Sequence, residues 1–169
     1  FRENEVTAHE GLMRCYFKEG DCENTILYAA KLISGDKVEI GVQTEAHLLN
    51  GRCYMEKNNL DEASQNFKNV AKVNSGIASA EAKYNLALIS NLNGQFKQSQ
   101  DECYEVINQV PSYEYWIGKS FILLGDNYLA LQDTFQAKHT YKSIIENYDS
   151  SPDDSEDLIK IAQDKFNAI

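Results

Sequence analysis

The chain has 169 residues with 16 Lys and Arg against 26 Asp and Glu, so its net charge is −10 at neutral pH. The length fits one domain or a section of a repeat array, and 43% hydrophobic residues argue against intrinsic disorder. The surplus of acid argues against nucleic-acid binding, and no apolar run is long enough to cross a membrane.

Four successive segments share one pattern, in which apolar residues recur at helical spacing on both sides of a tight turn. The first spans residues 6–43 with Gly20 at its turn, and the second spans 44–79 with Asn58 and Asn59 there. The third spans 80–117 and turns at Asn93 and Gly94, and the fourth spans 118–152. Paired helices with a period of 36 to 38 residues predict a helical solenoid.

Small residues recur where the two helices of a hairpin face each other. They predict that the helix axes approach to about 8–10 Å, with aromatic residues filling the gaps further along. The small residues are Gly51, Ala87 and Gly125 on the first helices, and Ala63, Ser99 and Ala137 on the second helices.

A final helix is expected over residues 153–168, because Leu158, Ile161, Ala162 and Phe166 form an apolar stripe. Ser150 or Ser151 can cap this helix, Pro152 suits its first turn, and the acids that follow complement its dipole. The helix either caps the array or begins a fifth repeat. The chain starts at Phe1 rather than Met, so we expect a fragment of a longer protein.

The third segment resembles the tetratricopeptide repeat family. Its Ala80-Glu81-Ala82, Tyr84-Asn85-Leu86, Asn93-Gly94-Gln95-Phe96 and Pro111 are similar to that family's consensus, and the resemblance in register covers residues 6–149. It implies one all-α domain over residues 1–169, a right-handed superhelical α-solenoid of about four hairpins plus the C-terminal helix. The end of the fourth repeat, residues 144–150, is similar to bacterial members and favours a bacterial source.

The resemblance further implies a concave face, lined by the first helices, that binds a partner. Three explanations of its apolar character stay open: a groove for an extended or helical peptide, a surface covered by the last helix or by flanking sequence, or helices buried on all sides. In the groove, Arg52 and Lys119 would orient an acidic group of the partner. The expected contact residues are Arg14, Leu48, Leu49, Arg52, Tyr84, Asn85, Leu88, Lys119, Ile122 and Leu123.

No catalytic motif accompanies the repeats, so the sequence predicts a non-enzymatic scaffold that binds a protein or peptide and needs no cofactor. The alternative is a structural spacer, or a module that forms homo-oligomers through its repeat ends, within a longer repeat protein. The compartment stays open between the cytoplasm and a bacterial periplasm.

The cysteines and histidines lack the spacing of metal ligands, which argues against a metal site. His9 and His47 occupy equivalent positions and are expected to be half-buried packing residues. Four dispersed cysteines are expected to be buried thiols that pack as small hydrophobic groups, which mildly favours a reducing compartment. They are Cys15, Cys22, Cys53 and Cys103.

Overall fold

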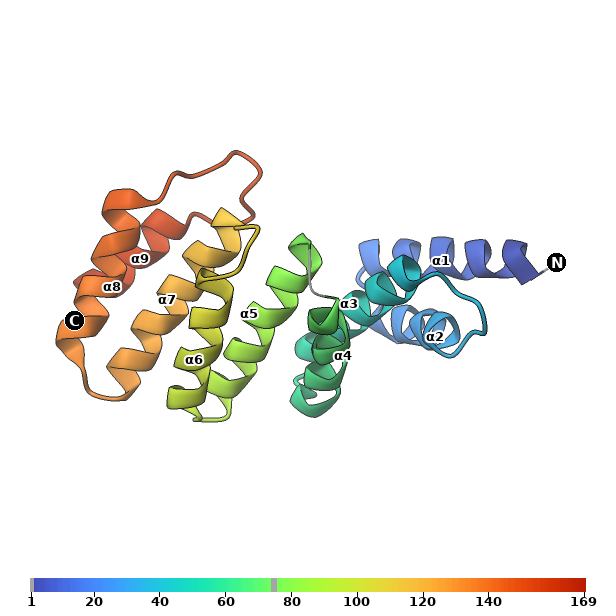
Figure 1. Ribbon diagram of the computed structural model, residues 1–169, viewed down its shortest axis with the longest axis horizontal. Helices are drawn as coiled ribbons and strands as arrows, with labels where there is room; N and C mark the ends of the chain where they lie inside the picture. The colour runs from blue at the N-terminus through green and yellow to red at the C-terminus, as the bar shows by residue number, and fades with distance from the viewer. Residues whose placement is uncertain (1, 74–75) are drawn as a thin grey trace. The chain divides into compact units, whose positions relative to one another are not determined.

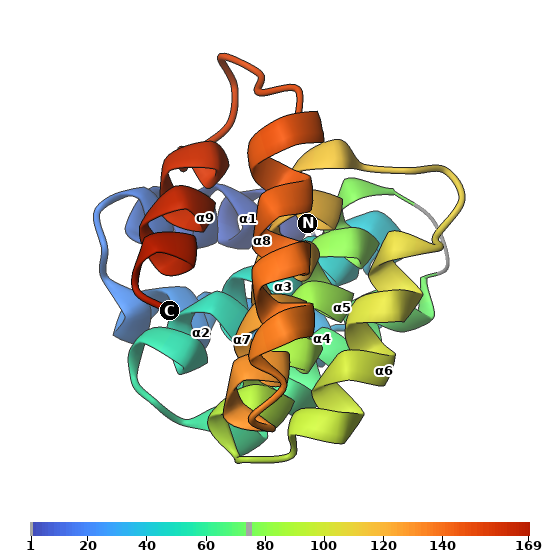
Figure 2. The same ribbon diagram turned by 90° about the vertical axis from the view of Figure 1, so that its left-hand side faces the viewer.

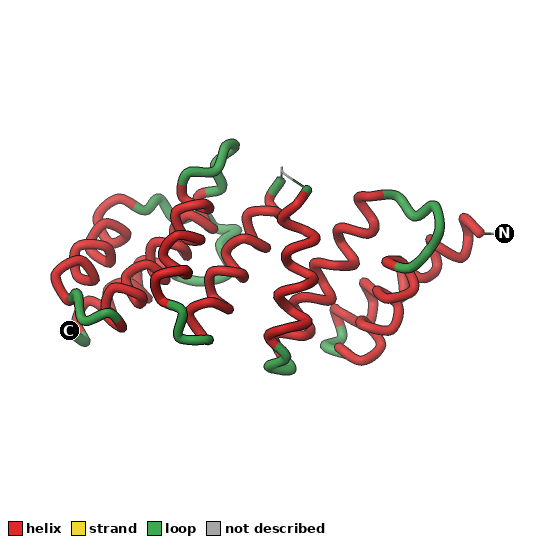
Figure 3. The backbone as a smooth tube through the Cα atoms, turned by 60° about the horizontal axis from the view of Figure 1, so that its bottom comes forward, coloured by secondary structure: helices red, strands yellow, loops and turns green. Residues whose placement is uncertain are grey.

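The structure, a computed structural model, describes residues 2–73 and 76–169, and within these ranges every regular element is an α-helix (Figure 3). The chain divides into an N-terminal part, Phe1–Ala82, and a C-terminal part, Lys83–Ile169. Successive helices pack against each other within each part, as in a helical repeat solenoid (Figure 1). The helices are α1 Arg2–Lys18, α2 Cys22–Ile33, α3 Ile40–Glu56, α4 Leu60–Lys72, α5 Ile77–Leu92, α6 Phe96–Ile107, α7 Glu114–Ala130, α8 Thr134–Asn147 and α9 Leu158–Asn167.

The four hairpin turns have the same backbone conformation. One residue of each turn has a positive φ, from 55° to 74°, and these residues are equivalent in the repeat register: Gly20, Asn58, Gly94 and Gln132. The next residue donates its N–H to a carbonyl five positions earlier, as Asp133 does to Tyr128 at 2.9 Å. This pairing satisfies the last carbonyls of the first helix and reverses the chain in three residues. The first three turns therefore lie where the sequence predicts them.

Glycine allows a close approach of two helices in the second and fourth hairpins. A Cβ atom on Gly51 would lie 2.7 Å from the fully buried ring of Phe67, and one on Gly125 would collide with the ring of Tyr141. Each glycine thus accepts a large aromatic side chain from the facing helix.

The pairing of a large with a small side chain extends to the other two hairpins. In the register positions of Gly51 and Phe67, the first hairpin has Met13 and Ala29, which are both fully buried in one cluster. The third hairpin places Ala87 and Cys103 there, again within one buried cluster. The large side chain therefore comes from the first helix in one hairpin and from the second helix in two others.

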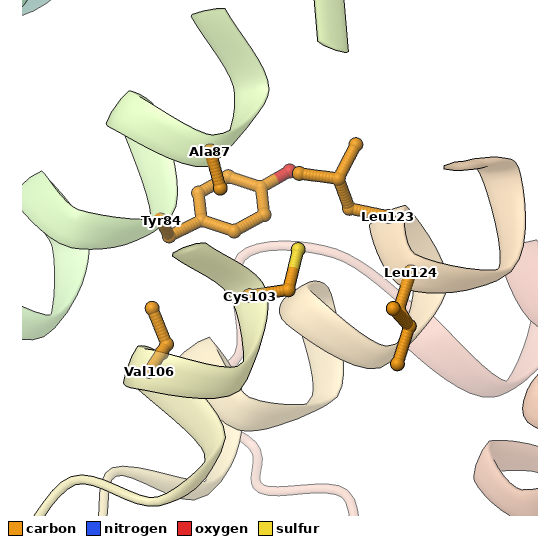
Figure 4. Packing of buried hydrophobic residues seen from close by; sticks show 6 residues of the cluster. All are labelled: Tyr84, Ala87, Cys103, Val106, Leu123 and Leu124. Carbon is orange, nitrogen blue, oxygen red and sulfur yellow. The ribbon is translucent and has the colours of Figure 1, made fainter. Parts of the chain in front are cut away.

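Two clusters of buried residues lie in the described core of the C-terminal part. In one, the ring of Tyr84 from α5 lies beside Ala87 and Cys103, with its hydroxyl directed toward Leu123 of α7 (Figure 4). In the other, Leu158 and Ala162 of α9 pack with residues of α7 and α8. The last helix therefore lies side by side with α8, after a connection that projects beyond the helix ends (Figure 2).

The last helix begins later than the sequence predicts, at Leu158 rather than near residue 153. Its cap is Asp157, whose carboxylate accepts the Lys160 N–H at 3.0 Å, and not a serine. The preceding residues form a folded connection instead, in which Asp154 accepts hydrogen bonds from the Tyr148 hydroxyl and the Ser151 N–H. The acidic side chain thus stabilises the connection and not a first helical turn.

The prediction of four buried thiols is wrong for three of the cysteines. Cys22 and Cys53 form a disulfide between α2 and α3, with their Cα atoms 5.2 Å apart. Cys15 is an exposed thiol, and Cys103 is the buried one. The disulfide forms because the packing of α3 on α2 brings together two residues that are 31 positions apart in the sequence.

Candidate functional site

The candidate site is the set of first-helix side chains that the sequence assigns to partner binding. In the N-terminal part, Arg14 lies on the exposed surface of α1 and already has two acidic partners. Its guanidinium donates to both carboxylate oxygens of Glu45, at 2.7 and 2.5 Å, and pairs with Glu10 at 2.6 Å. Arg14 therefore joins α1 to α3.

Arg52 makes the same contact one repeat later. It donates to both carboxylate oxygens of Glu81, at 2.5 and 2.6 Å, and its guanidinium carbon lies 5.7 Å from the centre of the Phe17 ring. Arg14 and Arg52 occupy equivalent repeat positions, as do Glu45 and Glu81. The two ion pairs are thus one interaction that recurs with the repeat. Paired guanidinium and carboxylate groups of this geometry fix the register of neighbouring helices.

Lys119 of the C-terminal part occupies the position that Glu45 and Glu81 hold in earlier repeats, so the sign of the charge is reversed there. Its ammonium group donates to the Glu156 carboxylate at 2.5 Å, and that carboxylate also accepts the Tyr115 hydroxyl at 3.0 Å. The ammonium group also lies between 5.0 and 5.9 Å from the ring centres of Tyr84, Tyr115 and Trp116. A carboxylate and three aromatic faces therefore surround this cation.

The ionisation of these groups follows from their contacts. The hydrogen bond from Lys119 holds the pKa of Glu156 below its ordinary value. Burial raises the pKa of the Tyr84 and Tyr115 hydroxyls, because the charged phenolate would lose its hydration. The site at neutral pH thus contains an ionised ammonium–carboxylate pair beside neutral phenols.

The apolar members of the predicted site are largely covered. Five of them, Leu48, Leu49, Tyr84, Ile122 and Leu123, are buried in the structure. Leu88 and Asn85 are partly exposed on α5, and Leu88 packs against the cluster that contains Tyr84. The accessible apolar and neutral polar surface at this site therefore centres on residues 85 and 88 of α5.

The covering side chains distinguish between the explanations of the apolar face. Ile122 lies in one cluster with Leu158 and Ala162, so α9 covers this side chain of α7. Glu156, just before α9, forms an ion pair with Lys119, the cation that the sequence assigns to an acidic partner. Leu49, in contrast, is buried within the N-terminal part, in one cluster with Met13 and Leu32. Coverage by the last helix thus explains Ile122, and burial by neighbouring helices explains Leu49.

His9 and His47 pack as expected. His9 is half-buried with its ring 5.6 Å from that of Tyr28, and half-buried His47 shares a 2.9 Å hydrogen bond with the Asn66 side chain. Trp116 packs partly buried beside Tyr84. Among the residues that the structure describes, no three His, Cys, Asp or Glu side chains are placed to hold a metal ion. None of the described helices is long and apolar enough to cross a membrane.

The comparison with known families identifies one of the repeats. The sequence profile of the tetratricopeptide repeat matches residues 115–151, which include nearly all of α7 and the whole of α8. The fourth hairpin is a tetratricopeptide repeat. No curated protein matches the chain. Tetratricopeptide repeats generally mediate contacts between proteins, and this all-helical fold is typically non-enzymatic.

The sequence pattern did not reveal the carboxylates that neutralise the predicted binding cations, namely Glu45, Glu81 and Glu156. A signal was present, because Glu45 and Glu81 recur at one repeat position just as Arg14 and Arg52 do. Recurrence of both charges in register indicates a contact between neighbouring repeats and not a contact with a ligand. Glu156 follows the same register, 37 positions after Lys119.

Proposed function

We propose that this protein is a non-enzymatic scaffold that binds a segment of another protein on its first-helix surface. The proposal rests on the tetratricopeptide match together with the partly exposed Leu88 and Asn85 on α5. A partner would bury Leu88 in an apolar contact and lie next to Asn85. Apolar contacts of this kind are typical of peptide recognition by helical grooves.

The charges of the surface favour one class of partner. Arg14, Arg52 and Lys119 each pair with a carboxylate of the same chain, so an acidic partner would have to displace Glu45, Glu81 or Glu156. The net charge of −10 also repels acidic segments. We therefore propose an apolar partner segment with basic flanks, whose association slows as ionic strength rises.

A photo-crosslinking experiment tests the binding surface. A photoreactive amino acid replaces Leu88 on α5, or His139 on the exposed face of α8 as the matched control. We expect the Leu88 position to crosslink a specific protein that the His139 position does not. For the captured partner, Leu88→Ala should weaken binding about 5- to 30-fold, as at an apolar interface contact. Equal crosslinking at both positions, or unchanged affinity, would reject this surface.

Self-association is the second candidate, and α1 carries the observation that favours it. The exposed residues Ala8, Leu12 and Cys15 on α1 are equivalent in register to Ala46, Asn50 and Cys53 on α3, which are buried against the preceding helices. A further helical pair, from another copy of the chain, could stack there in the same way. Sedimentation should then show association that depends on concentration and disappears in Leu12→Glu. A monomer at all concentrations would reject this candidate.

A further inference from the structure

The Cys22–Cys53 disulfide joins two hairpins of the N-terminal part. Cys22 is the first residue of α2, in the first hairpin, and Cys53 lies in α3, in the second. Its Cα separation of 5.2 Å is within the usual range for a disulfide. The bond therefore fixes α2 against α3 covalently, in addition to their packing.

The two sulfur atoms differ in access. Cys53 is fully buried, whereas Cys22 is partly exposed at the start of its helix. A disulfide is reduced when a thiolate attacks one sulfur in line and expels the other. We propose that the Cys22–Cys53 disulfide opens only through attack on Sγ of Cys22, and that its surroundings make it a lasting cross-link resistant to anionic thiols.

The leaving group is the first source of resistance. Attack on Cys22 expels Cys53 as a thiolate inside the core, where a charged sulfur loses its hydration. The other buried cysteine shows the size of this effect, since burial raises the pKa of the Cys103 thiol to about 12. A poorly stabilised thiolate leaves slowly. Attack on the accessible sulfur, that of Cys22, therefore expels the poorer leaving group, the buried Cys53 thiolate. Attack on Cys53 would expel the better leaving group, Cys22, but Cys53 is out of reach.

The Glu56 carboxylate is the second source of resistance. Its Oε2 atom lies 3.3 Å from Sγ of Cys22, on the exposed end of α3. Lys57, the next residue along the chain, pairs with Glu23 at 3.8 Å. An approaching thiolate thus meets a negative charge at the only sulfur that it can reach. Two like charges about 4 Å apart in water slow such an approach about fivefold at low ionic strength.

The reaction consumes two molecules of a small thiol. The first thiolate bonds to Sγ of Cys22 while the disulfide breaks, and its electron pair goes to Cys53, which takes a proton from solvent. A second thiolate attacks the sulfur of the bound thiol and releases Cys22, which is also protonated. The thiol is oxidised to its own disulfide, and the two cysteines are reduced.

The test uses three small thiols that differ in charge: cysteamine, 2-mercaptoethanol and 2-mercaptoethanesulfonate. They act on the folded chain at low salt in a Cys15→Ser background, which removes the exposed thiol. Acid quenching, alkylation and peptide mapping give the reduction rate per thiolate and the position of the mixed disulfide. We expect the mixed disulfide on Cys22 alone, and the fastest reaction with cysteamine and the slowest with the sulfonate.

The variant Glu56→Gln isolates the carboxylate, and the matched control is Glu105→Gln, an exposed carboxylate of α6 in the other part of the chain. Glu56→Gln should reduce the ratio of the cysteamine rate to the sulfonate rate about fivefold, and Glu105→Gln should leave it unchanged. Circular dichroism checks that both variants are folded. A mixed disulfide on Cys53, an unchanged ratio in Glu56→Gln, or free Cys22 and Cys53 thiols in the air-oxidised protein would each overturn the proposal.

Discussion

Replacing Gly51 by alanine tests the close approach of α3 and α4. The added Cβ atom would lie 2.7, 2.9 and 3.0 Å from three ring atoms of Phe67. Comfortable carbon contacts are about 3.5–4.0 Å, and the fully buried ring has little room to move. Overpacking of this kind costs about 1–3 kcal/mol, whereas alanine in place of glycine gains about 1 kcal/mol of helix propensity. Gly51→Ala should therefore lower the free energy of unfolding by about 0–2 kcal/mol.

The control is Gly11→Ala in α1, a helix of the same length in the same part of the chain. A Cβ atom on Gly11 would have no neighbour within 4 Å, so this variant should gain the full propensity of about 1 kcal/mol. The difference between the two variants cancels the propensity. It measures the cost of the close approach, which we expect to be about 1–3 kcal/mol.

Urea unfolding, followed by far-ultraviolet circular dichroism, measures the free energy of unfolding of both variants. The slope of this free energy against urea concentration should be the same in both, which shows that their unfolded states are alike. A second substitution, Phe67→Leu, makes room beside Gly51. Phe67→Leu should lower the free energy of unfolding less in the Gly51→Ala background than in the original chain. If Gly51→Ala stabilised the protein as much as Gly11→Ala, glycine would not be required for this approach and the reasoning would be refuted.

Three further predictions concern single groups. Gln132 has a φ of 64°, a conformation that costs a residue with a side chain about 1–2 kcal/mol. Gln132→Gly should therefore raise the free energy of unfolding, measured in urea, by about 1 kcal/mol. Gly94→Gln, the opposite substitution at the equivalent position of another turn, should lower it by a similar amount. Burial raises the pKa of the Cys103 thiol to about 12, whereas the thiol of an unfolded chain has a pKa of about 8.5. The contribution of Cys103 to the free energy of unfolding is therefore complete below about pH 8.5 and is lost as the pH rises toward about 12. Cys103→Ala should flatten the fall in the free energy of unfolding between these two pH values. The contact with Lys119 lowers the pKa of Glu156, so this contact stabilises the fold above the ordinary pKa of about 4.3 and is lost as the pH falls through the lowered pKa. Lys119→Met should raise the midpoint of the Glu156 carboxyl in an NMR titration. An unchanged midpoint would contradict Lys119 as the cause of the lowered pKa.

Local chemistry made the hairpins predictable from the sequence. Each turn is specified by a few neighbouring residues, so Gly20, Asn58 and Gly94 marked the positions where the backbone takes a positive φ. The recurrence of small residues at Gly51 and Gly125 likewise indicated contact with the facing helix, and both glycines do lie against that helix. The contacting atoms differ from the prediction, because they belong to the rings of Phe67 and Tyr141 and not to the small residues opposite.

Contacts between repeats were harder to predict, because they depend on which faces meet. Cys22 and Cys53 had no recognisable spacing, and only the packing of α3 on α2 places their Cα atoms within bonding range. Arg52 and Lys119 had the composition of a binding site, but each already bonds to a carboxylate 29 or 37 positions later. A charge on a helix surface does not reveal whether its partner belongs to the same chain.

The last helix shows how two local signals can compete. Ser150, Ser151 and Pro152 have the composition of a helix start, and so does Asp157. The helix is capped by Asp157, because Asp154 accepts hydrogen bonds from the Tyr148 hydroxyl and the Ser151 N–H and holds the preceding residues in a different conformation. These hydrogen bonds depend on the position of Tyr148 at the end of α8, which no local pattern specifies.

The exchange of large and small side chains between paired helices also constrains how such an array can change during evolution. Combining the first helix of one hairpin with the second helix of another would set Met13 against the ring of Phe67, or leave a void between Gly51 and Ala29. Duplication or recombination of a complete hairpin preserves the match, whereas a crossover within a hairpin destroys it. The heritable module of this protein is therefore the matched pair of helices, and its viable recombination points lie in the connections between pairs.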